Sequence, residues 1–364
     1  MELQKDSLKK YLGQKFGKPV KINDFRIIGE GVYGTAYLLD FKAKNGANRL
    51  VLKTMNRTGG FGHDYLSDIA QNLILANDTF NKLPKHIKSY DVIGEKKGEL
   101  FSIGGVENYH ILLEEAQGIT YYTDLDRILK EGITELDKKR TKAMAEYLAG
   151  IHKEKGTEPQ LYIRRARDLV GHGEYIMGVL DGYPKGAMDA KLKVEIVKKC
   201  VDWWQKLQKY SHRLSVVHGD FHPFNILFSE KETDFVTLDR SRGEFGEPAD
   251  DTTSLVMNYI FWSFTKYGRL TGEFKQLFDL FFETYFKKTK DREQLGVIAP
   301  YFAFRAIVVG NPIFYPDKWF LERGCKKPQE VRKKLYNFAN AVLSEEKMDL
   351  SRINNYVEGS RIIY

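Results

Sequence analysis

Cysteine and long apolar runs are scarce in this chain of 364 residues. Its two cysteines, Cys200 and Cys325, lie far apart and without metal-ligand spacing, so we expect two free thiols in a reducing compartment. No run approaches the roughly 20 apolar residues that a membrane-spanning helix needs. The charged N-terminal sequence lacks the apolar stretch of a secretory signal. We therefore expect a soluble, cytoplasmic protein.

The bulk composition is that of an ordinary globular protein. Hydrophobic residues make up 42% of the chain and charged residues 29%, which gives no sign of disorder. The length allows two domains or one large one. A net charge of +8 and a pI near 9.0 permit binding to nucleic acid or to an anionic membrane surface. Nucleotide phosphates need the same positive charge, so its sign does not discriminate between these partners.

The first third of the chain predicts a small, mostly antiparallel sheet. Residues 1–20 have the pattern of a basic amphipathic helix. The Asn-Gly pair at residues 45–46 is typical of a hairpin turn. Residues 64–80 are predicted to form the one helix that accompanies this sheet. The expected strands lie at residues 25–28, 35–41, 49–53, 89–93, 100–103 and 109–114.

After Gly118 the pattern changes to helices. Apolar residues recur at helical spacing in residues 138–152 (Met144, Tyr147, Leu148 and Ile151) and in residues 191–209 (Val194, Val197, Val201 and Trp204). Residues 251–290 and 330–346 are also predicted to be helical. We therefore expect an α+β fold with a β-rich lobe at residues 1–117 and an α-rich lobe at residues 118–364. Residues 220–251 interrupt the helices as loop and short strand, where chemistry is usually placed.

A glycine-rich turn and a lysine mark the β-rich lobe as a candidate phosphate-binding site. Gly29, Gly31 and Gly34 form a G-x-G-x-x-G pattern, which lets backbone amides approach phosphate oxygens. A dinucleotide-binding Rossmann unit is excluded, because a strand rather than a helix follows the glycines. Lys53 lies in the next strand but one, where a plain edge lysine is the alternative. Its ammonium group is expected to reach the α- and β-phosphates of a nucleotide.

The most informative segment is His-Gly-Asp-Phe-His-Pro-Phe-Asn at residues 218–225. Asp220 lies in a short loop, Asn225 enters a strand, and a second strand delivers Asp239. Phosphoryl transfer needs a carboxylate that accepts the proton of an alcohol, and oxygen ligands for magnesium. Asp220, Asn225 and Asp239 supply these groups in order. Any single aspartate could instead cap a helix, and we expect both histidines of the motif to be packed loop residues.

Residues 20–260 resemble the aminoglycoside phosphotransferase and choline kinase superfamily, a branch of the protein-kinase-like fold, through this motif and the Leu-Asp pair at 238–239. The resemblance implies a bilobal fold, ATP and Mg²⁺ as cofactors, and a small-molecule hydroxyl as acceptor. It implies Asp220 as the catalytic base and Asn225 with Asp239 as magnesium ligands. Lys53 would be the phosphate-binding lysine. Backbone groups at Glu114 and Ala116 would hold the adenine.

Two further elements follow from the same resemblance. His152 is expected to be structural, and Asp251, in the Gly-Glu-Pro-Ala-Asp-Asp segment at 246–251, is expected to brace the catalytic loop. The helical glutamate that pairs with the strand lysine in the family has no clear counterpart. No glutamate occurs between Lys53 and Glu95, so the substitutes considered are Asp68 and Gln71.

Arginines are unusually frequent near the expected acceptor site. They are Arg164, Arg165, Arg167, Arg240, Arg242 and Arg305. A solvated basic surface explains Arg164 or Arg165 alone, but guanidinium groups that flank the metal-binding aspartate suit carboxylate or phosphate recognition. A polycationic aminoglycoside would need an acidic pocket. The expected acceptor is therefore a neutral or anionic hydroxylated metabolite, such as a sugar.

Three other functions stay open at this point. A protein kinase would fit the β-lobe motifs, but the His-Gly-Asp form and the missing Asp-Phe-Gly element favour small-molecule kinases. A nucleotide-binding pseudokinase is favoured by the missing helical glutamate and opposed by the complete set Lys53, Asp220, Asn225 and Asp239. A nucleic-acid-binding protein would show strongly salt-dependent binding, but no recognised motif supports it.

Overall fold

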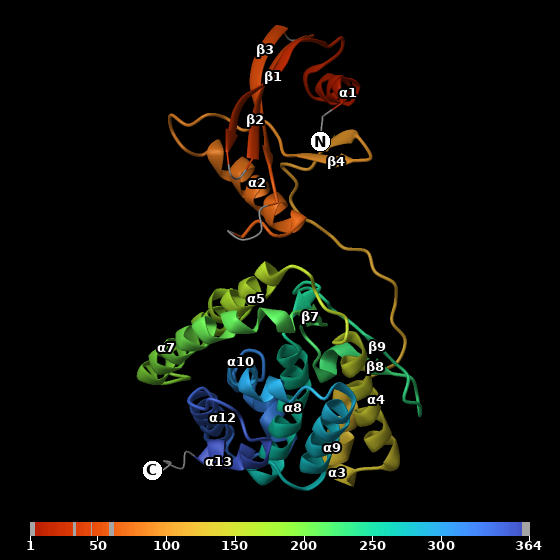
Figure 1. The fold of residues 1–364 in the computed structure, drawn as a ribbon, viewed down its shortest axis with the longest axis vertical. Helices are drawn as coiled ribbons and strands as arrows, with labels where there is room; N and C mark the ends of the chain where they lie inside the picture. The colour runs from red at the N-terminus through yellow and green to blue at the C-terminus, as the bar shows by residue number, and fades with distance from the viewer. Residues whose placement is uncertain (1–3, 32–33, 45, 58–61, 359–364) are drawn as a thin grey trace. The chain divides into compact units, whose positions relative to one another are not determined.

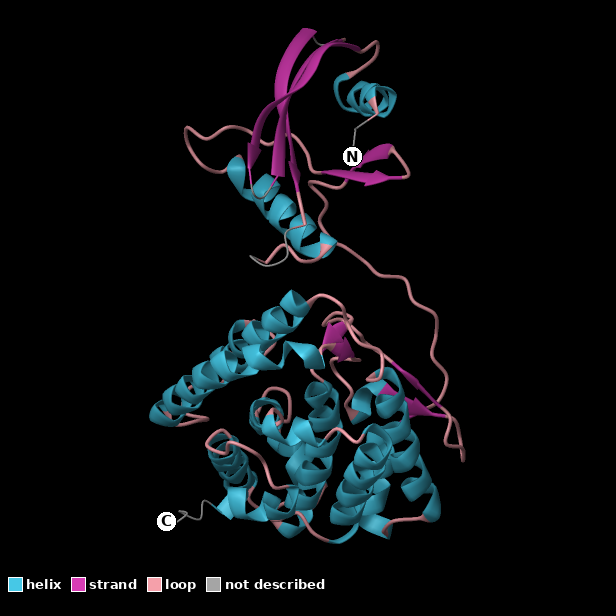
Figure 2. Ribbon diagram, viewed as in Figure 1, coloured by secondary structure: helices cyan, strands magenta, loops and turns pink. Residues whose placement is uncertain are grey.

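The computed structural model describes residues 4–31, 34–44, 46–57 and 62–358. The chain divides into two compact units, Met1–Leu113 and Glu114–Tyr364. The first is built mainly from strands and the second mainly from helices (Figures 1 and 2). The expected α+β fold, with small antiparallel sheets and a larger helical part, is thus observed.

A three-stranded antiparallel sheet forms the centre of the first unit. Its strands β1 (Lys21–Gly31), β2 (Gly34–Ala43) and β3 (Gly46–Met55) lie in the order β1-β2-β3. Helix α1 (Lys5–Phe16) packs its apolar side against this sheet and creates the core of the unit. The buried members of that core are Leu8, Tyr11, Leu12, Leu39, Phe41 and Ala43. Residue 45 of the predicted hairpin turn lies outside the described residues.

The rest of the first unit departs from the sequence prediction in two places. Both predicted helices, at residues 1–20 and 64–80, are formed, as α1 and α2 (Leu66–Phe80), whereas the strand predicted at residues 89–93 is formed only at Ile93. A hairpin of β4 (Ile93–Lys96) and β5 (Glu99–Ser102) follows. The strand predicted at residues 109–114 is not formed, because this segment is irregular and its side chains Ile111, Leu112 and Leu113 are exposed.

The second unit is a helical bundle. Its α-helices, in chain order, are α3 (Tyr121–Glu131), α4 (Glu135–Ile151), α5 (Pro159–Gly171), α6 (Ile176–Asp181), α7 (Ala190–Leu207), α8 (Pro248–Tyr267), α9 (Gly272–Thr289), α10 (Ala299–Gly310), α11 (Asp317–Glu322), α12 (Pro328–Val342) and α13 (Ile353–Glu358). Helix α8 is buried from Pro248 to Thr265. Helices α3, α9, α10 and α12 pack against it, so its amino end is held rigidly in the middle of the unit.

Short strands lie directly before α3 and between α7 and α8. Strands β6 (Ile119–Thr120), β8 (Ile226–Phe228) and β9 (Phe235–Thr237) form one small sheet, and β7 (Ser215–Val216) pairs with β10 (Phe245–Gly246). The segment predicted as loop and short strand, residues 220–251, has this character except where α8 begins. The motif at residues 218–225 lies between β7 and β8 and includes the short 3₁₀ turn η2 (Pro223–Asn225).

None of the helices formed by residues 4–358 that the structure describes is long and apolar enough to cross a membrane.

Candidate active site

The loop that carries Asp220 is fixed by a buried carboxylate beneath it. Asp251, on the first turn of α8, accepts hydrogen bonds from the backbone N–H groups of His218 (2.7 Å) and Gly219 (2.7 Å). Its Oδ2 also lies 3.1 Å from Nε2 of His152. Burial raises the pKa of Asp251, but His152 and the His218 amide outweigh it and leave this pKa below its ordinary value. The charged carboxylate therefore holds the backbone of the loop, as expected for Asp251.

Two arginines contact the carboxylate of Asp220 itself. Nη1 of Arg305, on α10, lies 2.7 Å from Asp220 Oδ1, and Nη1 of Arg242 lies 3.0 Å from the same oxygen. Burial raises the pKa of Asp220, but Arg305 first, and then His222 and Arg242, hold it well below its ordinary value. Asp220 is therefore a charged carboxylate, and its second oxygen, Oδ2, lies 3.5 Å from His222 Nε2.

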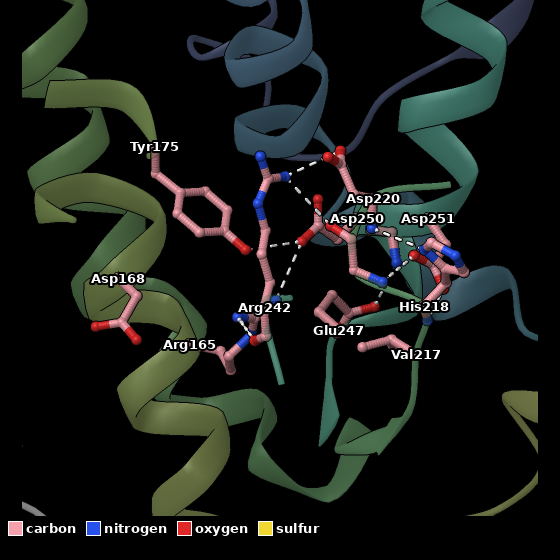
Figure 3. A network of polar contacts seen from close by, with 12 residues as sticks. Arg165, Asp168, Tyr175, Val217, His218, Asp220, Arg242, Glu247, Asp250 and Asp251 are labelled. Atoms are coloured by element: carbon pink, nitrogen blue, oxygen red, sulfur yellow. Dashed lines mark hydrogen bonds and ion pairs between the residues drawn. The ribbon is translucent and has the colours of Figure 1, made fainter. Parts of the chain in front are cut away.

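Asp250 is a second buried carboxylate of the same network (Figure 3). Its Oδ1 accepts a hydrogen bond from Arg305 Nη2 at 2.6 Å, so that Arg305 bridges Asp220 and Asp250. Its Oδ2 lies 3.4 Å from Arg165 Nη2 and 3.3 Å from the hydroxyl of Tyr175. Arg165 in turn donates a hydrogen bond to the carbonyl oxygen of Arg242. Side chains from α5, α8 and α10 thus converge on one loop.

The two histidines of the motif have structural contacts. Nδ1 of His218 accepts a hydrogen bond from the Asp220 amide (3.2 Å), and burial lowers the pKa of this histidine, which favours the neutral ring. Nδ1 of His222 accepts one from the Phe224 amide (3.2 Å) and so caps η2. Both interactions hold the turn that separates Asp220 from Asn225, which agrees with their interpretation as loop histidines.

Asn225 and Asp239 lie on the adjacent hairpin of β8 and β9. Asn225 Nδ2 donates a hydrogen bond to the carbonyl oxygen of Asp220 (3.1 Å), and the Asn225 carbonyl accepts one from the Leu238 amide (2.9 Å). Among the described residues, no hydrogen bond to the side-chain oxygen Oδ1 of Asn225 is found. Asp239 has a left-handed backbone (φ 55°) and an exposed side chain. Asn225 directly precedes β8 and Asp239 follows β9, so both lie at the same end of this hairpin.

The oxygen atoms of Asn225 and Asp239 are of the type that would hold a magnesium ion. Carboxylate and amide oxygens are the ligands that Mg²⁺ takes from proteins, and it usually keeps waters and substrate phosphates as the others. Within residues 4–358 as described, no three His, Cys, Asp or Glu side chains form a cluster that could hold a metal ion by themselves. Asn225 Oδ1 and Asp239 would therefore contribute part of a coordination shell completed by a nucleotide.

The candidate phosphate-binding residues lie in the first unit, on the neighbouring strands β1, β2 and β3 of its sheet. Ala36 of β2 pairs with Gly29 on one side and with Lys53 on the other, and Gly31 pairs with Gly34 at the end of the hairpin. A Cβ atom on Gly34 would lie 1.9 Å from the carbonyl oxygen of Thr54, so only glycine fits there. The side chain of Lys53 is exposed on β3. Residues 32–33 of the glycine turn lie outside the described residues.

The remaining predicted residues have less distinctive surroundings. Glu114 is exposed and Ala116 is half-buried in irregular chain that leads to β6. Asp68, considered as a substitute for the helical glutamate, accepts a hydrogen bond from the Tyr65 amide (2.8 Å) at the start of α2. This contact is that of a helix cap, and Gln71 is exposed.

The six arginines singled out from the sequence divide into three groups. Arg242, Arg305 and Arg165 belong to the Asp220 network. Arg240 instead donates hydrogen bonds to the carbonyl oxygens of Val217 and Glu244, and is therefore a support of the loop. Arg164 and Arg167 pair with Asp168 on α5.

Sequence reasoning missed Asp250 and Tyr175. Asp250 directly precedes Asp251 in the sequence, and this Asp-Asp pair was a signal that could have revealed it. No pattern marks Tyr175, whose role depends on the packing of α6 against α10.

Buried charges thus fix the loop that bears Asp220, and a hairpin with Asn225 and Asp239 at one end follows it. Residues 111–267 match the model of the phosphotransferase enzyme family, APH. The resemblance to the aminoglycoside phosphotransferase and choline kinase superfamily is thereby confirmed over a segment that contains the whole catalytic loop. A search of curated proteins found no match.

Solved structures similar to this chain include several small-molecule kinases. A glucosamine kinase has 11% sequence identity and a TM-score of 0.40, with 85% of this chain and 93% of that chain covered. The aminoglycoside phosphotransferase APH(4)-Ia has 16% identity and a TM-score of 0.35, with 92% and 98% covered. An amicoumacin kinase in complex with AMP-PNP, Ca²⁺ and amicoumacin has 12% identity and a TM-score of 0.37, with 84% and 88% covered. Likenesses at this level do not identify a substrate.

Proposed function

We propose that this protein is an ATP- and Mg²⁺-dependent phosphotransferase that transfers the γ-phosphoryl group to a hydroxyl of a small molecule. The observation that carries this proposal is the fixed segment that bears Asp220, Asn225 and Asp239. Asp220 is charged and offers one oxygen, Oδ2, away from its arginine contacts. The match of residues 111–267 to a phosphotransferase family supports the same reaction class.

Each proposed role follows from the contacts of its residue. Asp220 Oδ2 would accept the proton of the acceptor hydroxyl and orient its oxygen, while Arg305 and Arg242 hold Oδ1. Asn225 Oδ1 and Asp239 would hold Mg²⁺, which neutralises charge on the phosphates when bound. Lys53 and the amides near Gly29, Gly31 and Gly34 would hold the phosphates, and the backbone at Glu114 and Ala116 the adenine. Residues 1–113 would then be the nucleotide-binding lobe and residues 114–364 the catalytic lobe.

The charge around Asp220 supports a neutral or anionic acceptor, such as a sugar or a sugar acid, over an aminoglycoside. Three arginine side chains, Arg165, Arg242 and Arg305, surround the loop, and they would repel the ammonium groups of a polycation.

The decisive test is ATP turnover with a library of hydroxylated metabolites. We expect Mg²⁺-dependent turnover by the wild type, and a loss of about 100-fold or more in kcat for Asp220→Asn, which keeps the shape of the side chain but not its basicity. Nucleotide affinity, measured by titration calorimetry, should be unchanged in this variant. ATP binding without turnover for any acceptor would instead identify a nucleotide-binding regulator. Efficient phosphorylation of kanamycin with no activity on sugars or acids would overturn the acceptor class.

A further inference from the structure

Arg242 differs from the other two arginines around Asp220 in how its charge is neutralised. The side chains of Arg165 and Arg305 are 8% and 5% exposed, and both pair with the buried carboxylate of Asp250. Together with Arg242 they make three guanidinium groups against two buried carboxylates, Asp220 and Asp250. One positive charge is therefore left without a buried partner, and the contacts of Arg242 show where it lies.

Only one edge of the Arg242 guanidinium group is used within the loop. Nη1 contacts Asp220 Oδ1 at 3.0 Å and the Gly219 carbonyl oxygen at 3.3 Å. Nε, on the opposite edge, is shielded from solvent and has no hydrogen-bond partner among the described residues. The nearest carboxylate, Glu174 Oε2, stands 3.7 Å from Nε, which is too long for a hydrogen bond.

The plane of this guanidinium group is fixed before any ligand arrives. Its Cζ atom lies 5.0 Å from the ring centre of Tyr175 and 5.8 Å from that of Phe304. The Arg242 carbonyl is held by Arg165. A guanidinium group on two aromatic rings keeps its orientation, so its free edge is a preformed fork for a carboxylate or phosphate.

We propose that Arg242 is the anion-binding residue of the acceptor site, where a carboxylate or phosphate of the acceptor displaces the side chain of Glu174. Glu174 lies in the loop between α5 and α6, and its side chain is 60% exposed, so it can leave at little cost. An anion on Nε and Nη2 would share one guanidinium group with Asp220, which places the acceptor beside the carboxylate that receives its proton. This inference rests on the proposed kinase reaction and names the chemistry of its acceptor.

Titration calorimetry with inorganic phosphate as the probe, in the presence of Mg²⁺ and ADP to occupy the nucleotide site, tests the subsite without knowledge of the acceptor. We expect Arg242→Gln to weaken phosphate binding by about tenfold or more. Glu174→Gln should tighten it by about threefold, because the competing carboxylate is gone. Phosphate binding should therefore become weaker in Arg242→Gln and tighter in Glu174→Gln. Misfolding of Arg242→Gln would explain the first change but not the second.

Arg269→Gln is the matched control. Arg269 is an exposed arginine just beyond the carboxyl end of α8, whereas Asp250 and Asp251 lie at the amino end of this 20-residue helix. The two ends are about 28 Å apart at 1.5 Å per residue. Phosphate affinity should not change in Arg269→Gln. Equal affinities in the wild type, Arg242→Gln and Glu174→Gln, or no binding to the wild type, would overturn the subsite.

An acceptor screen with matched pairs separates this inference from the proposed function. For D-glucose and D-gluconate, or D-glucose and its 6-phosphate, the ratio of kcat/KM should favour the anionic member and fall about tenfold in Arg242→Gln. ATP turnover without that preference would overturn the anion subsite and leave the kinase reaction intact. Phosphate binding that depends on Arg242 in a protein without any ATP turnover would overturn the kinase reaction alone.

Discussion

Arg305 is the residue on which the charge of Asp220 depends most directly. One buried guanidinium group contacts Asp220 Oδ1, Asp250 Oδ1 and the Gly219 carbonyl oxygen. An ammonium group is a single point of charge and cannot replace this planar, branched contact. Arg305 therefore sets both the position and the pKa of Asp220.

Replacement of Arg305 by lysine tests this dependence through pH. The pKa of Asp220 lies below its ordinary value of 3.8, so the carboxylate is charged at any higher pH. Its pairing contributes to folding free energy above pH 3.8, and this contribution is lost as the pH falls through the lower, folded-state pKa. In Arg305→Lys the pKa of Asp220 should rise, because lysine makes fewer of these contacts. On the acid side of the pH profile, kcat/KM falls as Asp220 is protonated. We expect this fall, the acid limb of the profile, to begin about one pH unit higher in Arg305→Lys than in the wild type.

The control for that experiment is Arg269→Lys, which removes a distant guanidinium group and should leave the acid limb where it is in the wild type. An Arg305→Lys enzyme with an unchanged acid limb and a lower kcat would mean that Arg305 shapes the loop but does not control the charge of Asp220.

At the scale of the elements, the glycine hairpin shows how a single carbonyl oxygen can determine a residue type. Gly34→Ala would place a methyl group 1.9 Å from the Thr54 carbonyl oxygen, so β2 and β3 would have to separate. Gly29→Ala is the matched control, because nothing lies within 4 Å of its added Cβ. We expect Gly34→Ala to lower the free energy of unfolding of the first unit by about 2 kcal/mol or more, as measured in urea.

Gly29→Ala should change that free energy by no more than about 0.5 kcal/mol, relative to the same wild-type unfolding curve. Equal losses in the two variants would mean that the sheet responds to any added side chain in this hairpin. In that case the close approach of Thr54 would not be the reason for glycine at position 34.

The helices show what periodicity can and cannot predict. The segment 191–209 was predicted as a helix and is observed as α7, but its predicted face was wrong. Val194 and Val201 are exposed, and the buried residues are Ile196, Cys200, Trp203 and Leu207. Both sets have helical spacing. The choice between them is made by tertiary contacts, such as the hydrogen bond from Trp203 Nε1 to the Leu343 carbonyl oxygen.

The α+β fold expected from the sequence is observed, whereas the roles of the site residues stay predictions. Asp220, Asn225 and Asp239 are close in sequence, so a local motif was able to single them out. The bridge of Arg305 joins residues from three separate segments, and no local pattern reports such distant pairing. The predicted strand at 109–114 is apolar and β-branched in part, but it has no partner strand in the structure and stays irregular.

At the scale of the whole chain, the link between the two units is a site for selective cleavage. Leu112 is 99% exposed and Leu113 is 73% exposed, in irregular chain at the division after residue 113. Brief treatment with chymotrypsin should therefore cut first after Tyr109, Leu112 or Leu113 and give two stable fragments, as read by mass spectrometry. The buried aromatic residues of α8 in the second unit should resist.

Early cleavage inside α8 or α9, before the link is cut, would contradict this prediction. Leu112→Pro with Leu113→Pro supplies the control, since chymotrypsin does not cleave after proline and cleavage after Leu112 and Leu113 would then be lost.

The backbone of Asp239 limits which amino acids evolution or an engineer can place there. A φ of 55° is readily adopted by glycine, asparagine and aspartate, and much less readily by residues with longer or branched side chains. Long side chains do occur at such φ values in this chain, as at Lys231 (φ 58°), but the left-handed conformation costs them about 1–2 kcal/mol. Exchange of Asp239 for asparagine or glycine should therefore keep the turn, whereas exchange for glutamate or alanine should destabilise it by about 1 kcal/mol.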